Sequence, residues 1–219
     1  MRAITITTLF LVLTASVQAN MQITEYMYSG ALVPAGTGVD GEFIEFTNIG
    51  GPAVNMTGYS FDDSTRVAGS FSLSAFGTVQ PGESVILCQA LAADFKTAWG
   101  LGASVKVIGA NDQNLGRADE INIYDNTNAL VDRLTYDDQT ISGTIRTQFK
   151  SGWTPASNLG PFTINNQWVL SSVGDAQNSY TSTGGDIANP GTYVPEPATL
   201  SLLLVGSVLL APRRGGFVR

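Results

Sequence analysis

The side chains in this sequence that could carry out acid–base chemistry are mostly carboxylates. They form four close pairs: Glu42 with Glu45, Asp62 with Asp63, Asp119 with Glu120, and Asp137 with Asp138. A pair of carboxylates hydrolyses a glycosidic bond when the two face each other across a sugar, about 5–9.5 Å apart. Glu42 and Glu45 point to opposite faces of an expected strand, because side chains alternate along a strand. The adjacent pairs stand at strand ends, where aspartate commonly caps a turn, so no catalytic residue is predicted.

Histidine is absent from the sequence. This excludes Ser-His-Asp and Cys-His triads, histidine-ligated zinc and imidazole general bases. Cys88 is the only cysteine, so no internal disulfide can form, and it lies in an apolar run on the strand face of Ile86. We expect its thiol to be buried and unreactive. These observations predict a protein that is not an enzyme and that binds no cofactor.

Loop composition and charge bear on metal ions and nucleic acids. The loops 62–65 and 112–114 contain oxygen ligands, but neither has the spaced Asp-x-Asp-x-Asp-Gly register of a calcium loop, so no metal site is predicted. Between residues 20 and 194 there are 7 basic and 17 acidic residues, a net charge of about −10. Nucleic-acid binding depends on neutralised phosphates, so a nucleic-acid partner is excluded.

Short runs of β-branched and aromatic residues, separated by Gly, Pro, Asn and Asp, predict the elements that position these side chains. The predicted strands are 22–28, 42–47, 58–62, 70–73, 84–88, 104–108, 120–124 and 130–136. This spacing predicts an all-β fold, an antiparallel sandwich or barrel. Leu91, Phe95 and Trp99 share one helical face, so a short helix over 90–99 is expected to cover one end of the sandwich. Residues 125–128 predict a hairpin turn.

The pattern loosens over residues 139–193. Apolar residues occur around Trp153, Phe162 and 167–170, and a polar stretch follows at 174–185. We expect a partly ordered extension that packs one or two strands on the sandwich and ends in a linker. Trp99, Trp153 and Trp168 could form a sugar-stacking or protein-docking surface, but in a small sandwich core positions are favoured for them.

The succession of these runs resembles the lamin-tail domain. The matching segments are Ile23–Met27, Gly41–Asn48, Met56–Asp63, Val79–Leu87, Glu120–Tyr124 and Val131–Tyr136. The resemblance covers about residues 22–138 and implies an immunoglobulin-like β-sandwich, which we expect to occupy 20–138. Residues 186–193 resemble the closing turn that follows exported lamin-tail domains.

The N-terminus has the three parts of a secretory signal peptide. Arg2 precedes an apolar run over 4–15, and small residues then lead to a predicted cleavage site after Ala19. The alternative, a retained transmembrane helix, requires about 20 apolar residues. This run is shorter and is interrupted by threonines, so residues 1–19 are predicted to be removed.

The C-terminus, residues 194–219, has three parts in reverse order. The motif Val194, Pro195, Glu196, Pro197 is followed by an apolar segment at 198–211 and a basic tail with Arg213, Arg214 and Arg219. This order resembles the PEP-CTERM sorting signal of Gram-negative bacteria. The resemblance implies an exosortase-type processing enzyme as a partner, transient inner-membrane contact through 198–211, and delivery to the cell surface or the extracellular space. The alternative is a retained membrane anchor.

Besides a calcium-dependent adhesin, two functions remain open on the sequence alone. The first is an exported, non-enzymatic module of the cell envelope, biofilm matrix or adhesion machinery, with a polysaccharide or a surface protein as its partner. The second is an extracellular carbohydrate-binding or carboxylate-based hydrolytic accessory protein. A cleft that holds two facing acids with raised pKa values would favour the second, and a closed sandwich with its acids at loop ends would favour the first.

Overall fold

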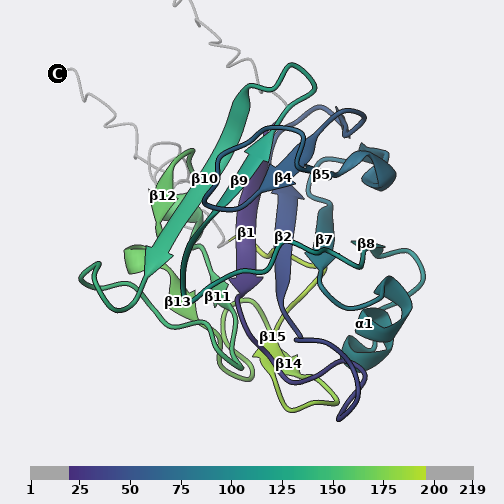
Figure 1. Ribbon diagram of the computed structural model, residues 1–219, viewed down its shortest axis with the longest axis vertical. Coiled ribbons are helices and arrows are strands. Elements are labelled where there is room, and N and C mark those ends of the chain that lie inside the picture. Colours follow the sequence, from purple (N-terminus) through teal and green to yellow (C-terminus); the bar gives the residue numbers. More distant parts are fainter. Residues whose placement is uncertain (1–19, 196–219) are drawn as a thin grey trace, which may run out of the picture.

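The computed structural model describes residues 20–195, and its strands form two stacked sheets (Figure 1). The predicted cleavage site at Ala19, the motif residues Glu196 and Pro197, the apolar segment 198–211 and the basic tail lie outside the described residues. The predicted all-β, immunoglobulin-like sandwich with one short α-helix is confirmed within the described range.

The first sheet is six-stranded. Its strands, in spatial order, are β13 (Val169–Leu170), β11 (Gly152–Trp153), β1 (Met21–Met27), β2 (Phe43–Asn48), β7 (Ser84–Cys88) and β8 (Lys106–Ile108). The second sheet is five-stranded. It runs β12 (Thr163–Ile164), β10 (Leu130–Asp137), β9 (Ala118–Tyr124), β4 (Ser60–Asp62) and β5 (Phe71–Ser72). The central pairings are antiparallel as predicted, whereas β7–β8 and β10–β12 are parallel.

Smaller elements complete the described fold. Two short antiparallel pairs are β3 (Val54–Asn55) with β6 (Thr78–Val79), and β14 (Tyr180–Thr181) with β15 (Ile187–Ala188). Three 3-10 helices are η1 (Ser74–Phe76), η2 (Ala156–Asn158) and η3 (Asn165–Gln167). The predicted hairpin joins β9 to β10, where the Asp125 carboxylate accepts hydrogen bonds from the backbone of Thr127 and Ala129 at 2.8 and 3.0 Å.

The main core lies between the two sheets and follows from alternation along the strands. Ile44 and Phe46 of β2 point inward and pack with Phe61 of β4 and Ile121 of β9, all at most 1% exposed. The other side chains of β2 point to the outer face and are buried as well. The six-stranded sheet is therefore covered on both faces, as the mixed composition of residues 42–47 indicates.

The helix α1 (Ala92–Trp99) supplies part of the outer cover. Its Phe95 and Trp99 pack on Phe43, with ring centroids 5.6 and 6.1 Å away. The helix lies beside β7 and β8 and packs on the outer face of the six-stranded sheet, at the end where β2 begins and β7 ends (Figure 1). The physical reason is that this face also carries apolar side chains, Phe43, Ile86 and Cys88, which require burial.

The C-terminal extension is more ordered than expected. It adds β11 and β13 to the first sheet and β12 to the second. The polar stretch at 174–185, expected as a linker, instead leads into the β14–β15 hairpin. Tyr180 anchors that hairpin, since its hydroxyl donates to the carbonyl of Trp99 at 2.9 Å and its ring packs edge-on against the indole. The polar composition of residues 174–185 suggested a linker. The segment is nevertheless ordered, because polar side chains in its turns hydrogen-bond to its own backbone.

Truncation of the inter-sheet core should destabilise the whole domain. Phe46→Ala removes a fully buried ring, and we expect the free energy of unfolding to fall by about 3–5 kcal/mol. Leu91→Ala is the control, because Leu91 is 63% exposed, and it should change stability by less than about 0.5 kcal/mol. Urea unfolding followed by tryptophan fluorescence measures both. Similar losses in the two variants would contradict a core centred on β2.

Candidate functional site

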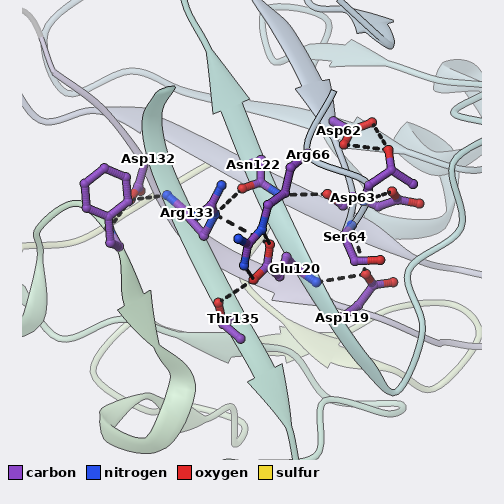
Figure 2. A network of polar contacts seen from close by, with 12 residues as sticks. Asp62, Asp63, Ser64, Arg66, Asp119, Glu120, Asn122, Asp132, Arg133 and Thr135 are labelled. Atoms are coloured by element: carbon purple, nitrogen blue, oxygen red, sulfur yellow. Dashed lines mark hydrogen bonds and ion pairs between the residues drawn. The ribbon is translucent and has the colours of Figure 1, made fainter. Parts of the chain in front are cut away.

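A network of charged side chains covers the outer face of the five-stranded sheet (Figure 2). Its centre is Glu120 of β9, which accepts from Arg66 Nε at 2.7 Å and from Arg66 Nη2 at 2.5 Å. Arg133 Nε of β10 lies 3.5 Å from Glu120 Oε2, and Thr135 Oγ1 donates to Oε1 at 3.2 Å. The hydrogen bonds from Arg66 hold the pKa of Glu120 below its usual value. An ionised carboxylate held by two guanidiniums is a poor general acid.

The adjacent acidic pairs serve as turn caps, as predicted. Asp62 accepts from Thr65 Oγ1 at 2.9 and 3.0 Å and from the backbone of Val67 at 2.8 Å. Asp119 accepts from the backbone N–H groups of Ser64 and Gly116 at 3.2 and 2.7 Å. A hollow of about 480 Å³ lies beside this network, but the acids that line it are already engaged in these bonds.

Asp137 and Asp138 are also tied to neighbouring groups. Asp137 accepts from the backbone of Gln139 at 2.9 Å, and Asp138 forms a two-pronged ion pair with Arg117, both contacts at 2.6 Å. Among residues 20–195 no cluster of three or more acidic or cysteine side chains could hold a metal ion. The three adjacent pairs therefore bind strands and turns to one another.

Asp132 of β10 connects three segments of the sandwich. Its buried carboxylate accepts backbone N–H groups of Ile23 in β1 at 2.8 Å, Arg133 at 2.7 Å and Phe162 at 3.3 Å. Burial raises its pKa to about 6, although the three backbone bonds lower it in part. Alternation alone places this acid on the inner face, where it links the two sheets.

The most unusual acidic pair is one that no local spacing indicates. Glu25 of β1 and Glu45 of β2 are directly opposite each other in the strand pairing, on the outer face of the six-stranded sheet. A β-bulge at residue 24 gives them a common face. They are 3% and 1% exposed, so neither carboxylate is open to a substrate. Sequence reasoning paired Glu45 with Glu42 and missed Glu25, which lies 20 residues away along the chain.

The C-terminal strap, defined here as residues 186–194, covers this pair. Glu25 Oε1 accepts the backbone N–H of Asn189 at 2.9 Å and the hydroxyl of Ser151 at 2.5 Å. Glu45 Oε2 accepts the N–H of Gly191 at 2.7 Å. Gly191 has a φ of 93°, and a Cβ there would lie 3.0 Å from the side chain of Val105. Glycine is therefore needed where the strap approaches the carboxylate.

Hydroxyl groups complete the solvation of Glu45. Its Oε1 accepts the hydroxyl of Thr24 at 2.7 Å, and Thr47 lies within reach of the same oxygen at 3.4 Å. Burial raises the pKa of Glu25 to about 8, and burial likewise raises that of Glu45. Such a pair shares protons readily, yet its contacts hold the strap in place and leave no room for a sugar or a peptide.

The remaining sequence candidates are structural. Glu42 and Glu45 point to opposite faces as predicted, since Glu42 accepts the backbone N–H of Leu115 at 2.8 Å on the inner side. Cys88 is buried as predicted, and burial raises the pKa of its thiol to about 12. The tryptophans occupy core positions, as favoured. Trp99, Trp153 and Trp168 are 3%, 4% and 5% exposed.

The predicted sorting motif begins where the described chain ends. Val194 is held at both backbone groups by Gln177, whose side chain accepts its N–H at 2.7 Å and donates to its carbonyl at 2.8 Å. Pro195, the next residue, is exposed. The strap therefore fixes the chain up to the first residue of the motif.

Comparison with known families identifies the sandwich. The lamin tail domain family matches residues 14–138, more than half of the chain. This chain belongs to the lamin tail domain family. A search of curated proteins finds no match. Within residues 20–195, no helix is long and apolar enough to cross a membrane. The family match ends before the extension, so the strap that closes this lamin tail domain lies outside the matched region.

Stability of the lamin tail domain should fall as pH rises from 4.5 to about 8. Over this range the folded state, with the raised pKa of Glu25, binds more protons than the unfolded chain, whose glutamates have a pKa near 4.5. We expect a loss on the order of 3 kcal/mol between pH 5 and pH 8, because each pKa unit corresponds to about 1.4 kcal/mol. Urea unfolding at several pH values measures it.

Glu25→Gln tests the origin of this pH dependence. Its amide oxygen can keep the bonds from Ser151 and Asn189, and it is neutral at both pH values, so the loss of stability should become smaller. Asp112→Asn, at an exposed acid, should keep the full loss. A slope unchanged by Glu25→Gln would mean that other groups, such as Glu42, dominate.

Asp132 should be required to join the two sheets. Asp132→Ala leaves three backbone N–H groups without their acceptor, and we expect a loss of about 2–4 kcal/mol in unfolding free energy. Asp132→Asn retains a carbonyl acceptor and should lose less than half as much. Equal losses, measured by urea unfolding at pH 7, would show that the charge and not the acceptor geometry matters.

Proposed function

We propose that this protein is an exported, non-enzymatic module of the bacterial cell surface or extracellular matrix. Its C-terminal residues would act as a PEP-CTERM sorting signal processed by an exosortase-type enzyme of the inner membrane. The signal peptide ending at Ala19 would start export, and the apolar segment 198–211 would halt in the membrane while the motif is processed.

The position of the motif carries this proposal. The sandwich is closed by the strap up to Val194, and the exposed Pro195 follows immediately. Proline at 195 and 197 favours an extended backbone, which a processing enzyme can bind without unfolding the domain. Removal of the tail would leave in place the hydrogen bonds from Asn189 and Gly191 to the buried glutamates and the bond between Gln177 and Val194, because these join residues up to 194.

The non-enzymatic role is supported by the state of the acidic groups. The three adjacent pairs cap turns or form ion pairs, Glu42 accepts the backbone N–H of Leu115, and Glu25 and Glu45 are sealed beneath the strap. A hydrolytic function needs two facing carboxylates that a substrate can reach. The acidic surface, with a net charge of about −10 between residues 20 and 194, favours solubility outside the cell and a polysaccharide or surface protein over nucleic acid as a partner.

Intact-mass measurement on cell fractions tests this proposal. In the native producing cell, we expect a species that begins at Asn20 and ends near Val194 in the matrix or culture medium. The triple variant Pro195→Ala, Glu196→Ala, Pro197→Ala should instead stay with the membrane and keep the mass of the tail. Pro161→Ala, at an exposed proline outside the motif, is the matched control and should be processed normally.

Three results would contradict the proposal. A native species that retains residues 200–210 in the membrane would mean that the tail is an anchor and that the domain is a tethered envelope protein. Normal processing of the triple variant would mean that the enzyme does not read this motif. Release of sugar from matrix polysaccharide by the purified protein would favour the hydrolytic alternative.

A further inference from the structure

Two hollows meet near the point where the chain leaves the sandwich. The first, about 310 Å³, is mostly apolar and includes Ile49, Leu159, Tyr193 and Pro195 in its lining. The second, about 420 Å³, shares Leu159 and extends along Phe162 and Ile164. We call this combined surface the terminal groove and define it by these six residues.

Phe162 lies in this groove, and its backbone has an energetically unfavourable conformation. Its side chain is 58% exposed, and its φ of 65° lies in the left-handed region that a bulky side chain rarely adopts. The N–H of Phe162 is held by the buried carboxylate of Asp132 at 3.3 Å, which fixes this conformation. Ile164, also in the groove, is 42% exposed. Phe162 and Ile164 therefore present apolar surface to solvent beside the second hollow.

The chain itself supplies a segment that suits this groove. Pro195 lines the groove, and the apolar segment 198–211 begins three residues later, a distance that extended chain covers in about 10 Å. The segment is rich in leucine and valine and is followed by Arg213, Arg214 and Arg219. Their positive charge complements the net charge of about −10 carried by residues 20–194.

We propose that the apolar segment 198–211 docks in the terminal groove of its own domain when it is not in a membrane. Leu159, Phe162 and Ile164 would contact its leucines, and the basic tail would face the acidic domain. The groove and the lipid bilayer then compete for the same segment. Removal of the segment would leave the groove open for other apolar partners. This docking is independent of which enzyme, if any, cuts the tail.

The tether favours this occupant over others. A segment attached next to its site has an effective concentration in the millimolar range, so weak apolar contacts suffice to hold it. Asn20, which follows the N-terminal run 4–15 in the sequence, also lies near the groove, because its carbonyl accepts the N–H of Ile49 at 2.9 Å. Asn20 does not line the groove, however, whereas Pro195 does.

Cysteine pairs in the full chain test the docking directly. The native Cys88 is buried and does not interfere. We expect the pair Phe162→Cys with Leu204→Cys to form an intramolecular disulfide at least about tenfold faster than Phe149→Cys with Leu204→Cys, in detergent-free buffer under mild oxidation. Phe149 is a matched control: it has a φ of 61° and 51% exposure, but it lies beyond the opposite end of β1, where its N–H donates to Ser29.

Hydrogen exchange gives a second measure that needs no cross-link. Phe162→Asn should raise the exchange rate of residues 198–211 at least about tenfold, because asparagine tolerates the left-handed backbone but removes the apolar contact. Phe149→Asn should leave that rate unchanged. Unfolding by urea checks that both variants remain folded.

Three outcomes would overturn the proposal. Equal cross-linking rates for the two pairs, or equal exchange in the two asparagine variants, would mean that the segment is not docked. Concentration-dependent dimers of Phe162→Cys alone would assign the groove to a second copy of the chain. Faster cross-linking of Phe162→Cys with Leu11→Cys than with Leu204→Cys would assign it to the N-terminal run.

Discussion

The rest of the structure depends on how the sandwich buries two facing glutamates. Glu25 and Glu45 lie opposite each other on the outer face of the six-stranded sheet, and their contacts come from hydroxyls and backbone N–H groups. Burial of a carboxylate is costly unless hydrogen bonds replace its water. The strap supplies two of these bonds, and it needs glycine at position 191 to come close enough to Glu45. The same residues therefore close the domain and replace the water around the two carboxylates.

This arrangement explains why the extension beyond the family match is ordered. A bare outer face would expose Phe43, Ile86 and the two glutamates together, and neither an apolar layer nor a polar one alone could cover such a mixture. The helix α1 covers the apolar part, while the strap covers the acidic part. The sealed interior that results leaves the surface and the terminal groove as the places where a lamin tail domain of this kind can meet other molecules.

Much of the sandwich could be predicted from local patterns. The strand 84–88 has the predicted bounds, and the hairpin at 125–128 and the helix ending at Trp99 form where their residues indicate. Alternation also placed Glu42 and Glu45 on opposite faces and Cys88 in a buried position. The extension was underestimated, because short strands such as β12 and β14 have two residues each and carry no periodicity to detect.

The sequence by itself determined the main strands and the one α-helix of residues 21–137, the exclusion of histidine chemistry and the order of the terminal segments. These properties depend on residue type and on neighbours along the chain. Only the tertiary structure decided that Glu25 faces Glu45, that α1 lies over a sheet face, and that the hollows lined by Pro195 and by Phe162 have Leu159 in common. Each of these follows from strand register, a bulge and long-range packing, and such contacts join residues that no local pattern relates.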